Sequence, residues 1–185
     1  MDNKVLFGIE NVHIAKLTEA NGTISYGTPF AVKGAVGFSF DPEGEEIVFY
    51  ADNVKYFISN SNQGYKGDLE VAVTPEEFLE QILGQVKTES GLMVESADDV
   101  SSRFALMFQA EGDAKKRRFC FFDCTASRPS RESKTKEESV DVGTEKLSIT
   151  MNPRSTDKVV KAYCEAGASS YDTFFEAVPV VTVNI

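Results

Sequence analysis

Residues 67–84 read GDLEVAVTPEEFLEQILG, and this stretch decides the fold because its apolar pattern changes from strand to helix periodicity. Leu69, Val71 and Val73 alternate with polar or small residues. A period of two is typical of a strand with one face buried and the other in solvent. The first part of this stretch therefore predicts a half-buried strand.

The second part predicts a short helix at about residues 75–83. Thr74 followed three positions later by Glu77 forms a capping-box pattern, and Pro75 suits the first helical position because its missing N–H costs nothing there. Gly84 supplies a stop signal. The apolar residues at i and i+4 spacing are Phe78, Leu79, Ile82 and Leu83. Because helices shorter than about 12 residues rarely persist alone in water, we expect this one to lie on a sheet.

Composition favours one folded domain over the whole of residues 1–185, with arms at 1–10 and 178–185. Hydrophobic residues make up 42% of the chain, with 14 Phe and no Trp. The three cysteines are a sparse, odd-numbered set, which argues against a disulfide framework. We expect neither a signal peptide nor a membrane span, because no stretch approaches the ~18 apolar residues that a span requires.

Charge is distributed unevenly along the chain. The formal net charge is −10; residues 1–100 carry six Lys/Arg and 17 Asp/Glu, whereas residues 101–185 carry 13 and 12. An acidic chain is poorly suited to tight nucleic-acid binding, since that affinity depends on neutralising phosphates. The asymmetry fits either an acidic soluble protein with a basic loop region, or a subunit whose oppositely charged ends meet head to tail.

The first half of the chain is mostly strand by pattern. Residues 11–18 (NVHIAKLT) alternate, and residues 34–41 (GAVGFSFD) place Val36 on the same face as two phenylalanines before Asp41 and Pro42 end the run. EEIVFYAD and VKYFISNS follow, joined by a two-residue Asp-Asn turn, and predict a hairpin.

The second half predicts further strands around a long polar loop. RFALMFQAE (103–111) and RRFCFFDCTA (117–126) are apolar on both faces, as expected of central strands, and TEKLSITMN (144–152) alternates again. The loop at 127–143 is long enough to be functional or disordered. Residues 157–167 fit helix or strand, and residues 171–178 predict a short helix before an extended tail. The expected fold is mainly β (α+β): a two-layer antiparallel β-sandwich or barrel with one flanking helix.

Residues that could carry catalysis are scarce. The single histidine, His13, lies in a strand context and is best interpreted as an ordinary half-buried residue. Cys120 and Cys124 are expected to face the same side as Phe122 and to be small core residues, because nothing completes a zinc set around them. Phosphate-binding glycine motifs are absent from the sequence. We therefore expect no enzymatic activity, no metal and no cofactor.

Basic residues between 115 and 136 are the candidate contact residues. The bland interpretation is a charged hairpin turn and a solvated loop; the alternative is a set of inter-subunit salt bridges in a self-assembling protein. The candidates are Lys115, Lys116, Arg117, Arg118, Arg128, Arg131, Lys134 and Lys136. We expect the 127–143 loop and the termini to make such contacts and to become ordered on assembly.

Several phrases, in matching order along nearly the whole chain, resemble one viral family. They are DPEG (41–44), FYADN (49–53), NQGYKGDLE with TPEEF and ILG (62–84), KKRRF, CTASRPS and KTKEES (115–139), and TEKLSITMNPR (144–154). Together they resemble the major tail proteins of long-tailed phages, the phi-thirteen type found in phages of Gram-positive bacteria.

The resemblance implies a tail tube fold and a structural virion protein assembled in the host cytoplasm. Copies would close into six-membered rings that stack into a hollow tube, with other tail proteins at the tip and head end. Genomic DNA would pass through at ejection without specific binding. Two alternatives stay open at this point: a tube subunit of a phage-derived bacteriocin or prophage particle, and a monomeric β-sandwich binding module.

Overall fold

The computed structural model describes residues 8–51, 53–131 and 143–182, and strands dominate that part of the chain. Its one helix is α1 (Glu76–Gln81). The strands are β1 (Glu10–Ala20), β2 (Thr23–Tyr26), β3 (Phe30–Ala31), β4 (Ala35–Glu43), β5 (Glu46–Ala51), β6 (Val54–Asn60), β7 (Gly64–Val71), β8 (Val86–Lys87), β9 (Met93–Val94), β10 (Phe104–Gln109), β11 (Arg118–Ala126), β12 (Ser130–Arg131), β13 (Glu145–Met151) and β14 (Lys161–Cys164). The expected α+β class with a large excess of strand is confirmed.

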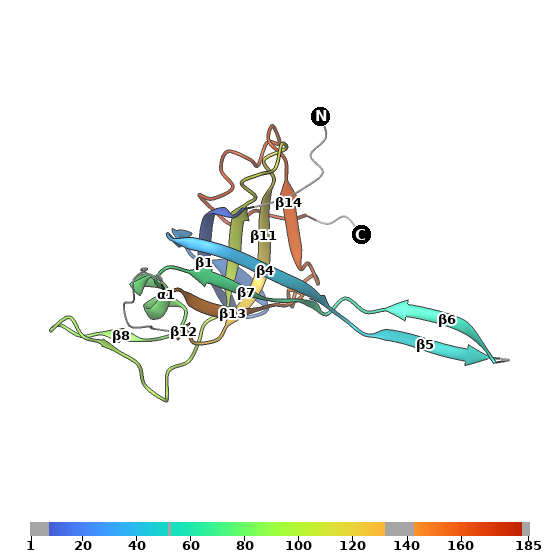
Figure 1. The fold of residues 1–185 in the computed structure, drawn as a ribbon, viewed down its shortest axis with the longest axis horizontal. Helices are drawn as coiled ribbons and strands as arrows, with labels where there is room; N and C mark the ends of the chain where they lie inside the picture. Colours follow the sequence, from blue (N-terminus) through green and yellow to red (C-terminus); the bar gives the residue numbers. More distant parts are fainter. Residues whose placement is uncertain (1–7, 52, 132–142, 183–185) are drawn as a thin grey trace, which may run out of the picture.

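Antiparallel pairing joins most of the described strands in one sheet with the order β2-β1-β10-β11-β13-β7-β4. Three short strands add to it: β3 pairs with β1, β12 with β13, and β14 with β11. Strands β4, β7 and β13 lie across β1, β10 and β11 (Figure 1), so the sheet curls over into two layers. The expected two-layer antiparallel sandwich is confirmed.

The main core lies between these two layers. Strand β7 contributes Leu69 and Val71, and the neighbouring β13 contributes Leu147, Ile149 and Met151, all fully buried. Both patterns follow the predicted alternation. From the other layer, the buried side chains of this core include Ile14, Phe104, Leu106, Phe108 and Phe121.

Aromatic rings fill one end of the main core. Phe38 of β4 meets Phe108 edge to face, with ring centroids 5.3 Å apart, and Phe40 meets Phe121 at the same distance. Tyr65 packs on Phe121 at 5.6 Å. Edge-to-face pairs add about 0.5–1.5 kcal/mol each beyond the area that they bury. This cluster contains four of the chain's 14 phenylalanines.

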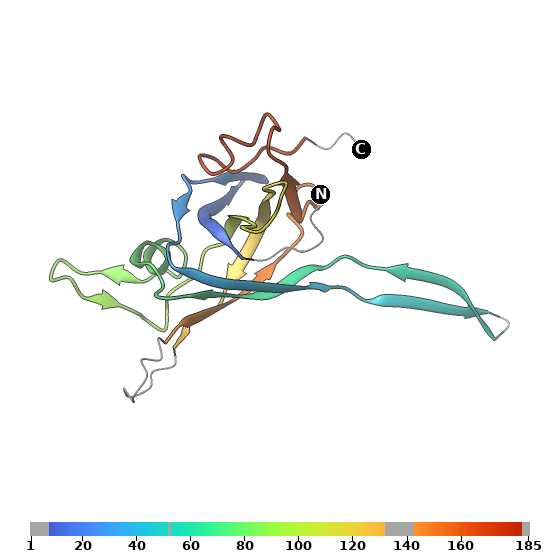
Figure 2. The same ribbon diagram turned by 45° about the horizontal axis from the view of Figure 1, so that its top comes forward.

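A second core covers the outer face of β1, β10 and β11. Met107 and Phe122, from β10 and β11, pack there against Phe174 and Val178 of the C-terminal segment. Figure 2 shows this segment on the side of β1 that faces away from β4 and β7. Strands 104–109 and 118–126 are therefore buried on both faces, as their sequences predict.

The two strand cysteines do not share a face, contrary to the expectation from sequence. The β10–β11 register shifts between Phe104, which pairs with Cys124, and Leu106, which pairs with Phe121. This irregularity moves Cys124 into the main core, whereas Cys120 stays with Phe122 in the second core. Both cysteines are fully buried, which confirms them as core residues. Burial raises the pKa of both thiols.

Helix α1 is present, but the capping box is not. Pro75 is the N-cap and no side chain caps the helix; among the described residues the buried Thr74 hydroxyl has no hydrogen-bond partner. Instead, the Thr74 N–H donates to Oε2 of Glu145 on β13 at 2.7 Å. A carboxylate distant in sequence thus takes the capping role that the local pattern assigns to Glu77. The apolar stripe is confirmed, since Phe78 and Ile82 are fully buried.

Three further strand-end expectations are wrong. Val73 is exposed, because β7 ends at Val71. Val36 is exposed because the β4–β7 register shifts between Ala35 and Gly37. Pro42 does not end β4 but pairs with Tyr65. A proline is tolerated there because β4 is the last strand on its side of the sheet and needs no donor outward.

The remaining corrections concern connections. Residues 161–164 form a strand, which settles the helix-or-strand ambiguity, and residues 171–178 form turns where a short helix is expected. The polar connection after Gly84 contains the small β8–β9 hairpin. Of the expected arms, residues 1–7 and 183–185 lie outside the described part; Glu10 already belongs to β1 and Val178 packs in the second core.

A buried ion pair ties β10 to β11. Nε of Arg103 donates to Oδ1 of Asp123 at 2.8 Å, and a second guanidinium nitrogen contacts Oδ2. Only 3% of the Asp123 side chain is exposed. Arg103 also contacts Glu19 of β1 at 2.8 Å, and Glu19 accepts a hydrogen bond from Ser155. Through Glu19 and Arg103, this network holds the loop that contains Ser155 against β1 and β11.

We predict that Arg103→Met destabilises the fold, because it leaves the Asp123 carboxylate buried without its cation. The expected loss is about 3 kcal/mol, at the lower end for one partner of a buried pair because Arg103 keeps a third of its side chain in water. Urea unfolding measures the change. Arg128→Met is the matched control, since it removes an exposed pair with Glu95 and should leave stability unchanged. Equal effects of the two substitutions would contradict the prediction.

The β10–β11 turn is organised by a buried carboxylate. Asp113 accepts a hydrogen bond from Nε of Arg117 at 2.5 Å and from the backbone N–H groups of Lys115 and Arg117. The Arg117 hydrogen bond, helped by these backbone donors, lowers the pKa of Asp113 from 3.8 to about 2. The charged form is thus favoured in the folded state, so its contribution to stability is present above about pH 4 and is lost as the pH falls toward 2.

We therefore expect Asp113→Asn to reduce the acid dependence of stability. The loss of unfolding free energy between pH 4 and pH 2 should be smaller in the variant than in the parent chain, because one carboxylate with a lowered pKa is gone. Denaturation midpoints across this pH range provide the measurement. Asp98→Asn, at an exposed carboxylate, is the control and should lose as much unfolding free energy over this pH range as the parent chain. If the Asp113→Asn variant loses as much unfolding free energy between pH 4 and pH 2 as the parent chain, Asp113 does not cause the acid dependence.

Candidate assembly surfaces

A long hairpin arm, defined here as β5–β6 (residues 46–60), extends from the body as a continuation of β4 and β7 (Figure 1). The hydrogen-bond ladder runs on across the junction: the Gln63 N–H donates to the Glu43 carbonyl at 2.9 Å and the Ser61 N–H to the Glu45 carbonyl at 3.0 Å. The direction of the arm is thus set by the sheet that it leaves.

Two backbone positions make this geometry possible. A Cβ at Gly44 would lie 2.0 Å from the Ser61 carbonyl oxygen, so glycine is required where the two strands approach at the junction. At the far end Asn53 has φ of 60°, the left-handed conformation that a two-residue hairpin turn demands and that asparagine tolerates. The predicted hairpin is confirmed, since Ala51 pairs with Val54; Asp52 of the expected Asp-Asn turn lies outside the described residues.

The arm exposes a large apolar surface that nothing in the described chain covers. Each of six side chains leaves more than half of its surface in solvent, and Tyr56 leaves 75%. They are Ile47, Phe49, Tyr50, Val54, Tyr56 and Phe57. Two-stranded hairpins are marginal alone in water, and contiguous exposed apolar patches usually mark interaction sites. The arm therefore has the composition of a contact surface.

Sequence reasoning identified this hairpin but not its exposure. Its signal is present: the runs EIVFYA and VKYFISN carry aromatic residues at adjacent positions, so both faces are apolar. The same pattern fits a central strand buried on both sides, such as β10. Local periodicity cannot distinguish a strand covered by its own chain from one that another molecule covers.

A second surface is the polar face of β4, β7 and β13. The register aligns Ser39, Asp68 and Ser148 in one row across the three strands and Asp41, Lys66 and Thr150 in the next. A third row contains Glu70 and Lys146. Ser148 donates to Asp68 at 2.6 Å. With Glu43 at its end, this face has four acids and two lysines, and the exposed Val36 lies at the opposite end of β4.

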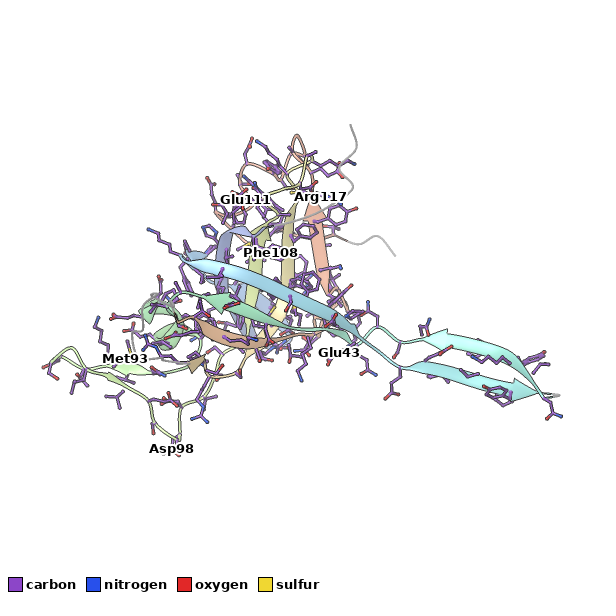
Figure 3. All side chains as sticks on the ribbon, viewed as in Figure 1. Glu43, Met93, Asp98, Phe108, Glu111 and Arg117 are labelled. Carbon is purple, nitrogen blue, oxygen red and sulfur yellow. The ribbon has the colours of Figure 1, made fainter. Side chains whose placement is uncertain are left out.

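The basic residues at 115–118 lie at one end of β11, beside the labelled Glu111 and Arg117 in Figure 3. Lys115 pairs with Glu165 at 3.0 Å and Arg117 with Asp113 at 2.5 Å. Lys116 is exposed and forms no ion pair within the described residues. Of these four basic residues, Lys116 has the charge that is most available for a contact with another molecule.

Arg118 holds the C-terminal segment on the body. Its guanidinium stacks over the rings of Tyr171, 3.7 Å from the centroid, and Phe175 at 4.8 Å, and it donates to the Tyr171 carbonyl. Cation–π contacts of this kind contribute about 0.5–2 kcal/mol each. Phe175 in turn stacks on His13 at 4.8 Å, so the lone histidine packs against this segment half-buried.

The other candidates follow the opposite end of β11. Arg128 pairs with Glu95 at 2.8 Å, and Arg131 pairs with Glu145 at 3.3 Å. Lys134 and Lys136 lie outside the described residues. The structure thus separates the predicted set into two groups, which a nine-residue strand of about 30 Å keeps apart. Their role in contacts between subunits stays a prediction.

Several solved structures match this chain, and two of them are parts of the anti-feeding prophage. The anti-feeding prophage cap, described as the tube-terminating cap, aligns over 90% of this chain and 97% of its own, with 10% identity and a TM-score of 0.50. The anti-feeding prophage baseplate, six-fold symmetrised, aligns over 91% and 100% with 12% identity and a TM-score of 0.45. Among curated proteins, none matches the sequence significantly. No described helix is long and apolar enough to cross a membrane.

The sequence profile of one family covers nearly the whole chain. The family is described as phage tail tube protein, and the match spans residues 2–176. It confirms the resemblance read from the turn and strand phrases, and it identifies a structural component of a virion tail. The chain belongs to the phage tail tube protein family.

Proposed function

We propose that this chain is the major tube subunit of a phage tail, which polymerises with itself into stacked rings around a channel that conducts DNA at ejection. The observation that carries the proposal is the protruding apolar arm, which a monomer would have no reason to expose. Six copies per ring follow the family resemblance of the sequence.

The arm suits a contact between successive rings. Full burial of a large apolar side chain contributes about 1.5–3 kcal/mol, and the arm's side chains are each more than half exposed. Each should therefore contribute about 1 kcal/mol when covered. The total for one arm is comparable to the ~4–15 kcal/mol cost of bringing two molecules together. A single arm contact is thus weak, but arms that a closed ring engages together share that cost.

We further propose that the polar face of β4, β7 and β13 lines the channel. Its excess of acids repels phosphate, and its small polar side chains offer no aromatic surface on which bases could stack. Aspartates and glutamates at this face would let DNA slide without specific binding. Tail proteins at the tip and the head end would close the tube, and no catalytic step is required of the chain.

The arm is tested by placing one charge in its apolar face. Phe57→Asp should raise the minimum concentration for tube formation at least tenfold, since it removes about 1 kcal/mol of apolar burial and also places a carboxylate without a partner in the covered contact. The thermal midpoint of the monomer should not change, because Phe57 projects from the body. Light scattering over a concentration series and negative-stain microscopy measure assembly and reveal ring symmetry.

Asn60→Asp is the matched control for this variant. It adds the same charge to the same strand at a polar position and should assemble like the parent chain. Normal tube yield with Phe57→Asp would show that the arm is not the contact that drives stacking.

The channel assignment is tested by reversing charge on the polar face. Asp41→Lys with Asp68→Lys should leave tubes intact but slow DNA release from complete particles, because two lysines per subunit attract the passing phosphates. The slowing should diminish at raised ionic strength, where such contacts are screened. Ser25→Lys, an exposed position on β2, serves as the control. Unchanged release kinetics at low salt would place this face outside the channel.

A further inference from the structure

A second exposed apolar surface lies at the end of the molecule opposite the arm. Figure 3 labels Met93 and Asp98 at this end, whereas Glu43 marks the base of the arm. Val86 pairs directly with Val94 across the β8–β9 hairpin, and Leu92 lies two residues before Val94, so the three share one face.

This surface, called the β8–β9 face here and made by Val86, Leu92 and Val94, is open to solvent. Leu92 is 64% exposed, and Val100 beside the hairpin is 80% exposed. Like the arm, β8–β9 is a separate two-stranded sheet, to which no other described strand pairs. The molecule therefore has two small uncovered sheets at its two ends.

The β8–β9 hairpin is anchored to the body and is thus prepared to receive a partner. Lys87 pairs with Glu76 of α1 at 2.5 Å, and the Gln85 N–H donates to the Leu79 carbonyl at 3.0 Å. Arg128 holds the following residues through Glu95 at 2.8 Å. A receptor fixed in this way loses little conformational freedom when it binds.

We propose that the β8–β9 face is the receptor for the arm of the next copy of this chain. The face formed by Ile47, Phe49 and Phe57 would pack on Val86, Leu92 and Val94 of a neighbour. Because donor and receptor lie at opposite ends, the contact is head to tail, and in the proposed tube it joins copies of successive rings. Repetition of this contact extends a filament along the direction of the arm.

Charge offers one local contact for this choice of occupant. The arm carries two acids, Glu46 and Asp52, and one basic residue, Lys55, which lies near its tip; the segment at 85–102 carries four acids against one lysine, so Lys55 is the arm residue that this segment would attract. Three apolar side chains on each side cover far less than the ~800 Å² per partner of a standard stable interface. One such contact is too small for a lasting dimer, so it requires the closed rings of the proposed function, on which this inference rests.

Cross-linking in assembled tubes tests the pairing. Ser59 pairs with Ile47 and lies two residues after Phe57, so a thiol there reports on the same face and keeps the aromatic anchor. Ser59→Cys and Leu92→Cys are prepared separately in a Cys164→Ser background, where the remaining Cys120 and Cys124 are buried. The two are co-assembled and treated with a short bis-maleimide. We expect a covalent dimer in the mixture and none with either variant alone. Ser59→Cys mixed with Ser25→Cys on β2 is the control and should give none.

Each other outcome overturns a defined part of the proposal. Tubes without the mixed dimer would exclude the β8–β9 face as the receptor and leave the tube function standing. A dimer from Ser59→Cys alone would indicate that arms pair with each other in a symmetric contact. A chain that stays monomeric at every concentration and in the presence of tail-tip extract would contradict both the tube function and this inference.

Discussion

The register between β4, β7 and β13 is the constraint on which the rest of the structure depends. The alternation that buries Phe38, Leu69 and Leu147 is the same alternation that exposes Ser39, Asp68 and Ser148. A slip of one residue would exchange the two sets and place carboxylates in the core. The register also determines where the arm begins, because β5 and β6 continue β4 and β7. Core, polar face and arm are therefore specified together, by one set of backbone hydrogen bonds.

Much of the fold could be predicted because its signals are local. The alternation through Leu69 and Val71, the doubly apolar 104–109 and 118–126, and the Asp-Asn turn all depend on near neighbours in sequence. The errors arose where a distant partner decides. Glu145 replaces the local capping box at Thr74, and a register shift in β11 sends Cys124 to the other core. Neither effect leaves a trace in periodicity, since each depends on strands that meet only in the folded chain.

The candidate contact surfaces were harder to predict than the fold. Basic residues stand out in a sequence, yet Arg117, Arg118, Arg128 and Arg131 all have partners within the subunit. Apolar residues such as Phe57 do not stand out, because a strand covered by its own chain has the same composition. What distinguishes the arm is the absence of a covering layer, and only the arrangement of the described strands reveals it. Composition thus located the charged residues, but it did not show which apolar surface the chain leaves uncovered.

Weak contacts have an advantage in the proposed tube. An arm that bound a single partner tightly would join monomers at random, because the β8–β9 face is exposed before any ring has formed. An arm contact too small to hold two copies selects instead for partners already arranged in a ring, where several arms engage at once. The acidic excess of the chain favours the same order of events, since like-charged monomers repel at long range and approach only where a specific contact offsets the repulsion. Polymerisation then depends on ring closure, and the arm's modest apolar area becomes a condition for ordered growth.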